Sequence, residues 1–246
     1  MRADLYLVQH GLIETRAKAQ EAIAAGNVSV DGAVVTKPSQ KIAEGAVVTA
    51  QPAHPWVSRA ALKLLAGLAA FGIDPAGRVC LDVGSSTGGF TEVLLDRGAA
   101  KVYSVDVGRD QLHPRLRADL RVVSMEGVDA RSLTASDCSP SPSLIVCDAS
   151  FISLLKVIPN PMSLAANQAD LIALIKPQFE VGKASVGKGG LVKSGTERAR
   201  AVAEVRAALD GLEGFFVRDV MESPVKGGDG NQEYLIAAHR NVESDR

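Results

Sequence analysis

The sequence predicts an α/β fold, a doubly wound and mainly parallel sheet with an antiparallel strand, preceded by a small α+β unit. From Arg78 onward, short apolar runs alternate with helical segments, the pattern of parallel strands joined by helices. The last two apolar runs follow one another across a glycine-rich connection, so we expect an antiparallel strand pair at the end of the sheet. A chain of 246 residues accommodates one such domain and a smaller module.

The large domain is expected over residues 60–246 and begins with a helix at about 60–71. Its strands are short apolar runs, and helical segments separate most of them. The strands are predicted near residues 79–83, 101–106, 121–124, 143–148, 170–175, 215–221 and 233–239. The further helices are predicted near residues 89–97, 151–158 and 196–212.

Residues 1–50 are predicted to form a separate unit of two helices and a small sheet. The first helix begins near Leu5, and the second is capped by Thr15 and ends at Gly26. Short strands are expected at residues 28–30, 34–35 and 47–49, with Asp31-Gly32 as a tight turn. Two prolines then mark residues 51–59 as a linker.

Arg16 and Lys18 lie on the second helix and are followed by the turn-rich segment 26–32. This arrangement resembles the alpha-L RNA-binding motif first described in a small-subunit ribosomal protein. The alternative is a solvated helix with two ordinary charges. The formal net charge of −1 gives no overall basic excess, so any RNA contact requires local patches of this kind.

The composition argues against several classes of protein. No stretch approaches the ~18 apolar residues of a membrane helix and no export signal is visible, so we expect a cytoplasmic protein without membrane contact. Cys80, Cys138 and Cys147 are too scattered for a disulfide framework, and the four histidines are dispersed, so no metal site is expected. The sequence does not indicate an oligomeric state.

A glycine-rich loop follows the first predicted strand of the large domain and leads directly into a helix. In an open α/β sheet, ligands bind at the carboxyl ends of strands. Ser86 stands where a dinucleotide fingerprint needs its second glycine, which disfavours NAD, and no lysine or arginine is placed to hold phosphate. The candidate ligand-binding residues of the loop are Gly84, Ser85, Ser86, Thr87, Gly88, Gly89 and Phe90.

Three carboxylates near strand ends complete this candidate site. Asp106 ends the second strand and suits the two hydroxyls of an adenosine ribose, because an ionised Asp only accepts hydrogen bonds. Asp82 suits an ammonium group on the same ligand. Asp129 either accepts from the adenine amino group or caps a turn.

Four further charged residues stand at strand ends or on helix faces: Lys63, Asp148, Lys176 and Glu233. We expect them to converge beside the ligand. The alternative is four unrelated surface charges, but Asp148 and Lys176 each terminate an apolar run that predicts a central strand.

These segments together resemble the TlyA family, over nearly the whole chain. The resemblance rests on residues 56–59, 84–90, 148–153, 176–180 and 230–234. It implies an alpha-L RNA-binding domain joined to a Rossmann-like, FtsJ-like methyltransferase that uses S-adenosylmethionine to methylate the 2′-hydroxyl of cytidines in ribosomal RNA. It also implies that the four charged residues form the catalytic Lys-Asp-Lys-Glu tetrad. His54-Pro55 precedes Trp56 where the family commonly has a basic residue and Ala, so a linker role in sensing the cofactor is unsupported here.

The tetrad suits this chemistry because a ribose hydroxyl is a poor nucleophile and must lose its proton as it attacks the methyl group in line. Lys176 is the candidate for aiming that hydroxyl or for deprotonating it. A lysine is a base only when neutral. Lys63 and desolvation favour the neutral form of Lys176, whereas Asp148 and Glu233 favour the charged form.

Residues 181–193 nearly match the sequence motif of a phosphate-binding P-loop, but Gly189 replaces the Ser or Thr that would hold magnesium. We interpret the segment as a mobile basic loop whose Lys183, Lys188 and Lys193 meet RNA phosphates, and we add Arg59 of the linker to the RNA-binding residues. Plain solvent exposure of a flexible loop is the alternative.

Other functions on the same fold stay open at the level of the sequence. One is methylation of a small molecule or a protein, since fold alone does not fix substrate. Another is a non-enzymatic role, as an RNA-binding factor or as a membrane-active haemolysin. Family members modify the large ribosomal subunit alone or both subunits, and the short tail over residues 241–246 favours the large subunit.

Overall fold

The computed structural model describes residues 1–212 and 214–242, and the chain divides into two compact units, Met1–Trp56 and Val57–Arg246. The division falls inside the segment 51–59, for which a linker remains the prediction. Most of the short tail, on which the expectation for the large subunit depends, lies outside the described residues.

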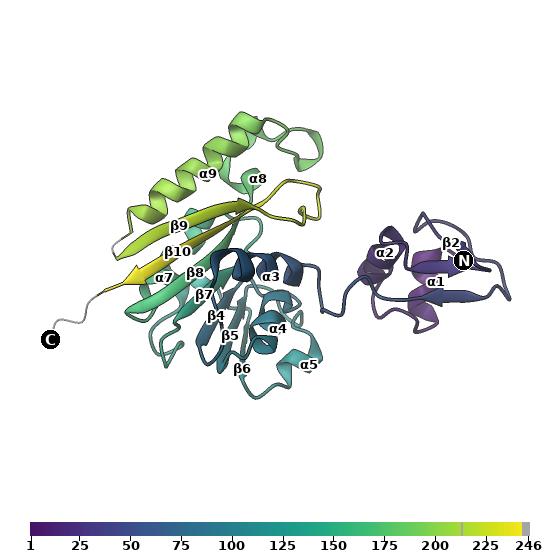
Figure 1. Ribbon diagram of the computed structural model, residues 1–246, viewed down its shortest axis with the longest axis horizontal. Coiled ribbons are helices and arrows are strands. Elements are labelled where there is room, and N and C mark those ends of the chain that lie inside the picture. The colour runs from purple at the N-terminus through teal and green to yellow at the C-terminus, as the bar shows by residue number, and fades with distance from the viewer. Residues whose placement is uncertain (213, 243–246) are drawn as a thin grey trace. The chain divides into compact units, whose positions relative to one another are not determined.

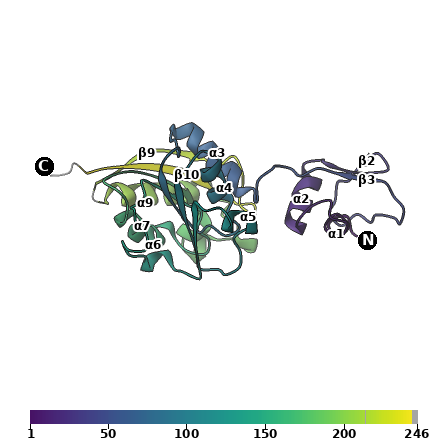
Figure 2. The same cartoon turned by 90° about the horizontal axis from the view of Figure 1, so that it is seen from below.

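The N-terminal unit is built as expected, from two helices and a small antiparallel sheet (Figure 1). Its elements are α1 (Ala3–Gln9), α2 (Arg16–Ala24), β1 (Val28–Val30), β2 (Ala33–Val34) and β3 (Val48–Ala50), with strand order β2-β1-β3. The Thr15 hydroxyl caps α2 by accepting from the Lys18 backbone N–H. Asp31 and Gly32 both adopt positive φ, as a two-residue hairpin turn requires. Figure 2 shows both helices on one side of the sheet, where their apolar residues are buried.

The C-terminal unit contains a seven-stranded sheet in the order β6-β5-β4-β7-β8-β10-β9. The strands are β4 (Val79–Val83), β5 (Lys101–Asp106), β6 (Val122–Glu126), β7 (Leu144–Cys147), β8 (Gln168–Ile175), β9 (Phe215–Glu222) and β10 (Tyr234–Asn241). Neighbours from β6 to β8 are parallel, and β10 is antiparallel to both β8 and β9. The predicted mainly parallel sheet with a terminal antiparallel pair is therefore confirmed.

Helices cover both faces of this sheet, α3 and α4 on one and α6, α7 and α9 on the other (Figure 2). This is the doubly wound arrangement that alternating strands and helices predict. The helices are α3 (Ala60–Phe71), α4 (Gly89–Asp96), α5 (Pro114–Arg117), α6 (Leu154–Val157), α7 (Pro159–Ser163), α8 (Pro177–Glu180) and α9 (Gly195–Asp210), with 3₁₀ turns η1 (Ala130–Ser132), η2 (Lys183–Ser185) and η3 (Lys188–Gly190).

One predicted helix is wrong in its extent. The segment 151–158 does not begin as a helix, because Phe151 adopts a φ of +64° and the chain turns helical only after Ser153, whose hydroxyl caps α6. A second short helix, α7, then starts at Pro159, since proline lacks the N–H that a first helical residue leaves unused. The difference matters because it leaves residues 148–153 as a loop at the sheet edge.

The strand directions bring distant residues to one edge of the sheet. The parallel strands β4, β5, β7 and β8 all end there, so Asp148 follows β7 and Lys176 follows β8 at neighbouring positions. Strand β10 runs the other way and starts at this edge, where Tyr234 pairs with Ile175. Glu233, just before β10, therefore lies beside Lys176 although 57 positions separate them in the numbering.

Candidate active site

The structure brings Lys63, Asp148, Lys176 and Glu233 together as an alternating chain of charges. The Lys63 ammonium donates to Glu233 Oε2 at 2.6 Å and lies 3.9 Å from Asp148 Oδ2. The Lys176 ammonium lies 2.6 Å from Asp148 Oδ1. Lys63, Lys176 and Glu233 are buried, so these charges are stable only because they neutralise one another. The alternative of four unrelated surface charges is excluded by this geometry.

Helix α3 carries Lys63 into this cluster because it packs closely on the sheet. Gly67 faces β8 and β10, where an added Cβ would lie 3.3 Å from Ile172 Cγ2 and 3.6 Å from Leu235. A glycine one turn after Lys63 thus lets the helix approach the strands that flank Lys176 and Glu233. The buried face of α3 includes Ala61, Leu64 and Leu68.

The Lys176 ammonium forms an ion pair with Asp148 Oδ1 at 2.6 Å. It also donates hydrogen bonds to the Asp148 carbonyl oxygen at 3.2 Å and to Ser150 Oγ at 2.7 Å. Ser150 is exposed and lines the adjacent pocket, so it connects the buried lysine with solvent. Sequence reasoning missed Ser150, although it lies two residues after Asp148 in a segment that was singled out.

A pocket of about 600 Å³ opens beside the tetrad at the carboxyl ends of β4, β5 and β7. Strand β4 is the point where the strand order reverses, the position at which open α/β sheets bind ligands. The polar lining includes Ser86, Asp106, Asp129, Asp148 and Ser150. Apolar side chains, among them Val83, Val105 and Val128, form other parts of its wall.

Only part of the predicted glycine-loop set lines this pocket. Gly84 and Ser86 do, and Gly84 has to be glycine: its φ is +79°, and a Cβ there would lie 2.9 Å from the Ala149 Cα. The structure places five other predicted ligand-binding residues outside the lining: Ser85, Thr87, Gly88, Gly89 and Phe90. Gly88, with a φ of +94°, turns the chain into α4, and Phe90 is buried against the core. Turn formation accounts for Gly88 and packing for Phe90, and the other three stay predicted ligand-binding residues.

Asp106 and Asp129 both line the pocket, but their surroundings differ. Asp106 is held by two backbone N–H groups, from Ser86 at 2.8 Å and Gly108 at 2.7 Å, so its carboxylate is fixed at the mouth of the loop. Asp129 caps η1 through the Arg131 N–H and also pairs with the Arg131 guanidinium, which holds the pKa of Asp129 below its ordinary value. The structure thus shows the turn-capping role that the sequence left as one alternative.

Asp82 is fully buried and does not line the pocket. Its Oδ2 accepts from the Thr91 hydroxyl at 2.7 Å, whereas Oδ1 has no hydrogen-bonding partner among the described residues. Burial raises the pKa of Asp82 to about 7, with smaller contributions from the charges of Asp148 and Asp106. An unpaired buried carboxylate oxygen at a strand end is an acceptor that a ligand's ammonium would satisfy.

The residues at this site fit S-adenosylmethionine. The Gly84 backbone leaves no side chain in the way of a ligand, and Asp106, Asp129 and Asp148 give the lining an acidic character that suits a cationic molecule. Asp106 suits ribose hydroxyls, and the apolar lining suits an adenine ring. The basic residue of the lining, Arg131, is paired with Asp129, so it is not free to bind the phosphate of a ligand.

The predicted RNA-binding residues of the N-terminal unit take part in ion pairs. Arg16 donates to Asp4 at 2.8 Å, and Lys18 donates to Glu14 at 2.7 Å. Asp4, which sequence reasoning missed, is buried and also binds Arg2 and Gln20; its pKa is well below the ordinary value, chiefly through the Arg2 hydrogen bond. Half of the Arg16 side chain stays exposed, so pairing does not remove it from a binding surface.

The basic loop is exposed at Lys183, Lys188 and Lys193 but is more structured than expected. It contains η2 and η3, and Val181 and Val192 pack with Ala201. Buried Asn231 ties it to the β9–β10 connection, donating to the Gly190 carbonyl oxygen and accepting from the Val192 N–H. The Arg59 side chain reaches the same connection, because a Cβ added to Gly228 would lie 3.2 Å from the Arg59 guanidinium.

The described residues contain neither a cluster of side chains able to hold a metal ion nor a helix that could cross a membrane. All three cysteines are buried, and burial raises the pKa of the Cys80 and Cys147 thiols to about 12, which fits packing and not reactivity.

Comparison with known proteins assigns the family. Residues 56–240 match the FtsJ-like methyltransferase family and residues 1–48 match the S4 domain. The chain is 46% identical to the 16S/23S rRNA (cytidine-2′-O)-methyltransferase TlyA of Mycobacterium tuberculosis, over 96% of this chain and 88% of that protein. The chain belongs to the TlyA family. It is thus a member of a family of S-adenosylmethionine-dependent methyltransferases with an N-terminal RNA-binding domain.

Two other similar proteins extend the comparison. Hemolysin A of Brachyspira hyodysenteriae is 40% identical over 96% of this chain and 98% of its own length. A solved structure from Streptococcus thermophilus, also described as a hemolysin, superposes with a TM-score of 0.77 at 37% identity and covers 98% of this chain and 88% of that one. The family that the sequence motifs indicated is therefore confirmed.

Proposed function

We propose that this protein transfers the methyl group of S-adenosylmethionine to the 2′-hydroxyl of cytidine in ribosomal RNA. The observation that carries the proposal is the buried Lys-Asp-Lys-Glu chain whose Lys176 end meets the pocket through Ser150. The relative from Mycobacterium tuberculosis, which carries that activity in its name, supports the substrate.

The bound cofactor supplies an activated methyl group, and the protein's own residues do the rest. Asp106 would hold the ribose of the cofactor, and Asp82, whose Oδ1 has no hydrogen-bonding partner among the described residues, would accept a hydrogen bond from its ammonium. Asp148 fixes the Lys176 side chain with an ion pair at 2.6 Å, and the Lys63–Glu233 pair closes the cluster on the other side. The substrate hydroxyl would approach the Lys176 Nζ, which would aim the oxygen at the methyl carbon.

The proton of the hydroxyl must leave as the new O–C bond forms. The Lys176 ammonium pairs with the Asp148 carboxylate and donates to the Asp148 carbonyl oxygen and to Ser150 Oγ, and of these two residues Ser150 is the exposed one. We infer that the substrate hydroxyl takes the place of Ser150 on Lys176. Either Lys176 orients the hydroxyl as an ammonium while water removes the proton, or a neutral Lys176 accepts it.

The N-terminal unit and the basic loop are proposed to bind the RNA. Residues 1–50 would act as the RNA-binding domain through Arg16 and Lys18, and Lys183, Lys188, Lys193 and Arg59 would contact phosphates near the catalytic centre. Removing residues 1–50 should weaken RNA binding and leave the affinity for S-adenosylmethionine nearly intact. Equal RNA affinity without this segment would refute these domain roles. The cytoplasm stays the predicted compartment.

The test of the function uses the full chain, S-adenosylmethionine labelled in the methyl group, and ribosomal subunits or free ribosomal RNA. We expect label in RNA and a new 2′-O-methyl mark at a cytidine, mapped by reverse transcription. Lys176→Ala should abolish transfer, whereas Lys101→Ala, at the start of β5 and so at the opposite edge of the sheet, should not. Label transfer unaffected by Lys176→Ala would remove the catalytic assignment.

A further inference from the structure

A second pocket, of about 760 Å³, adjoins the cofactor pocket and is not used by the mechanism proposed above. Its lining comes from residues 151–153, Lys156, residues 178–183 and Val186. Phe151 and Ile152 line both pockets, so the two hollows meet along these side chains. The second pocket also lies close to the catalytic centre along the chain, because its lining residues Gln178 and Phe179 belong to α8, whose N-cap is Lys176.

Phe151 lies at this boundary, and both its exposure and its backbone conformation are unfavourable. The residue is 91% exposed, and its φ of +64° lies in the left-handed region that non-glycine residues seldom adopt. Exposed aromatic surface and a strained backbone both lower stability, and such strain gathers at functional sites. A second ring, that of Phe179, lies 5.4 Å from it and is tilted by 50°.

The charges around the second pocket are positive. Lys156 and Lys183 are exposed on its lining, and neither forms an ion pair with a carboxylate in the described part of the chain. The acidic residue of the lining, Glu180, is engaged elsewhere: it accepts from Ser153 Oγ at 2.6 Å and from the Leu154 N–H at 2.8 Å, and so holds the start of α6. Aromatic rings combined with free ammonium groups are the signature of a site for unpaired nucleotides.

We propose that this second pocket binds the nucleotide adjacent to the methylated one, with its base stacked on Phe179 and its phosphate near Lys156 and Lys183. Phe151 then acts as a wedge between that base and the target base, because its exposed ring separates the two hollows. The proposal rests on the proposed function, since it requires an RNA substrate at the tetrad. This role explains why an aromatic side chain is solvent-exposed at the edge of the catalytic loop.

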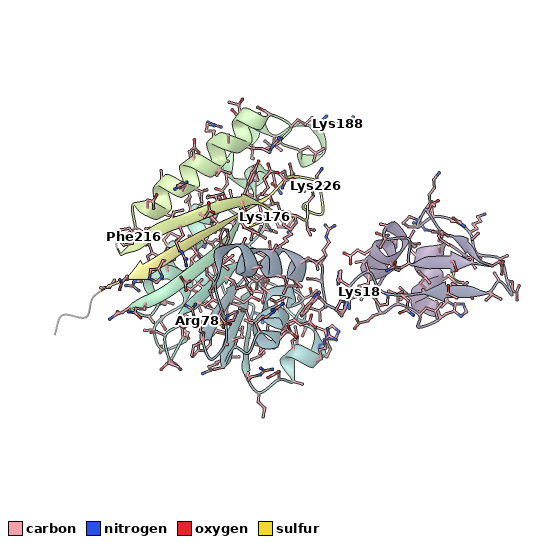
Figure 3. The ribbon with its side chains drawn as sticks, viewed as in Figure 1. Lys18, Arg78, Lys176, Lys188, Phe216 and Lys226 are labelled. Atoms are coloured by element: carbon pink, nitrogen blue, oxygen red, sulfur yellow. The ribbon has the colours of Figure 1, made fainter. Side chains whose placement is uncertain are left out.

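The position of the base is tested by photo-crosslinking. Phe179 is replaced by p-azidophenylalanine in the full chain, and this variant is irradiated together with the ribosomal subunits that the wild type methylates. Reverse transcription then locates each crosslink relative to the methylated nucleotide. We expect a crosslink at the immediately neighbouring nucleotide. The same replacement at Phe216, an aromatic residue 63% exposed at the other end of β9 from the loop that carries Lys226 (Figure 3), is the control and should not crosslink there. Crosslinks from position 179 only to the target or to distant nucleotides would overturn the proposal.

A kinetic comparison covers the case in which the photoreactive protein is inactive. Phe179→Ala should raise KM for the RNA about tenfold, as expected for the loss of one base–aromatic stack, with kcat changed less than about twofold and the affinity for S-adenosylmethionine unchanged. Phe179→Tyr should restore the wild-type KM, and Phe216→Ala should leave it unaltered. Equal KM values for all variants would refute the subsite while the function stands. If the wild type itself leaves no methyl mark, the proposed function fails instead.

Discussion

The clearest quantitative prediction concerns the buried carboxylate of Asp82. Burial raises its pKa from 3.8 to about 7, a difference of about three pH units, and each unit corresponds to about 1.4 kcal/mol. The folded protein therefore keeps a proton on Asp82 between these two values, while the unfolded chain has lost it. The stabilising contribution of Asp82 is fully present below pH 3.8 and is lost as the pH rises through about 7, a total of about 4 kcal/mol.

Urea unfolding followed by circular dichroism, at pH values between 5 and 8, measures this contribution. The unfolding free energy of wild type should fall relative to that of Asp82→Asn by about 1.4 kcal/mol per pH unit up to pH 7 and then level off. Asp96→Asn, an exposed carboxylate on α4, is the control and should run parallel to wild type. A difference between wild type and Asp82→Asn that does not change with pH would show that Asp82 titrates normally.

The same carboxylate makes cofactor binding depend on pH. If only ionised Asp82 accepts the ligand's ammonium, the fraction of the protein that can bind the ligand rises from about 3% at pH 5.5 to half at pH 7. The Kd for S-adenosylmethionine should therefore fall about 15-fold over this pH range. This window lies below the ordinary pKa of an α-amino group. Calorimetry with 5′-methylthioadenosine, which has no amino group, should show no such trend. Retention of the full pH dependence by Asp82→Asn would exclude this carboxylate as its source.

Three further predictions concern separate parts of the molecule. Lys176→Met should lower kcat by about 10²- to 10⁴-fold and leave the calorimetric Kd for S-adenosylmethionine within about twofold; a lost Kd would instead indicate a disrupted pocket. Gly84→Ala should destabilise the large unit by about 2 kcal/mol and weaken cofactor binding, because the added Cβ meets the Ala149 backbone at a φ of +79°, whereas Gly77→Ala, where a Cβ has open space, should spare binding. Asp4→Ala should destabilise the N-terminal unit by about 2 kcal/mol in thermal unfolding, since Arg2 and Arg16 lose a buried partner; an unchanged Tm would show that these pairs contribute nothing.

Strands and their pairing were predictable because each depends on a local pattern. Apolar runs such as 79–83 and 170–175 can be buried only inside a sheet covered on both faces, and the short glycine-rich connection before Tyr234 leaves no room for a crossover helix. Convergence of the tetrad followed from the same reasoning, since Asp148 and Lys176 each end such a run. Strand ends are therefore the positions at which sequence alone locates functional side chains.

The residues that were missed or misplaced depend on features that a linear pattern does not contain. Phe151 looked like the start of a helix, because nothing in its identity announces a positive φ. Ser150 was overlooked since its role depends on the position of Lys176, 26 residues away. Asp82 remains a predicted partner of the ligand's ammonium, but no linear pattern indicated that strand alternation buries it beneath the glycine loop, outside the pocket lining.

The antiparallel strand β10 explains why this sheet can hold a buried tetrad at all. With parallel strands alone, the edge would offer one carboxylate, Asp148, to the two buried ammonium groups of Lys176 and Lys63, and the uncompensated positive charge would be unstable. Because β10 begins at this edge, Glu233 reaches Lys63 at 2.6 Å and restores neutrality. Replacing Glu233 alone should thus harm folding more than replacing Lys63 and Glu233 together with apolar residues, since the double change removes both buried charges.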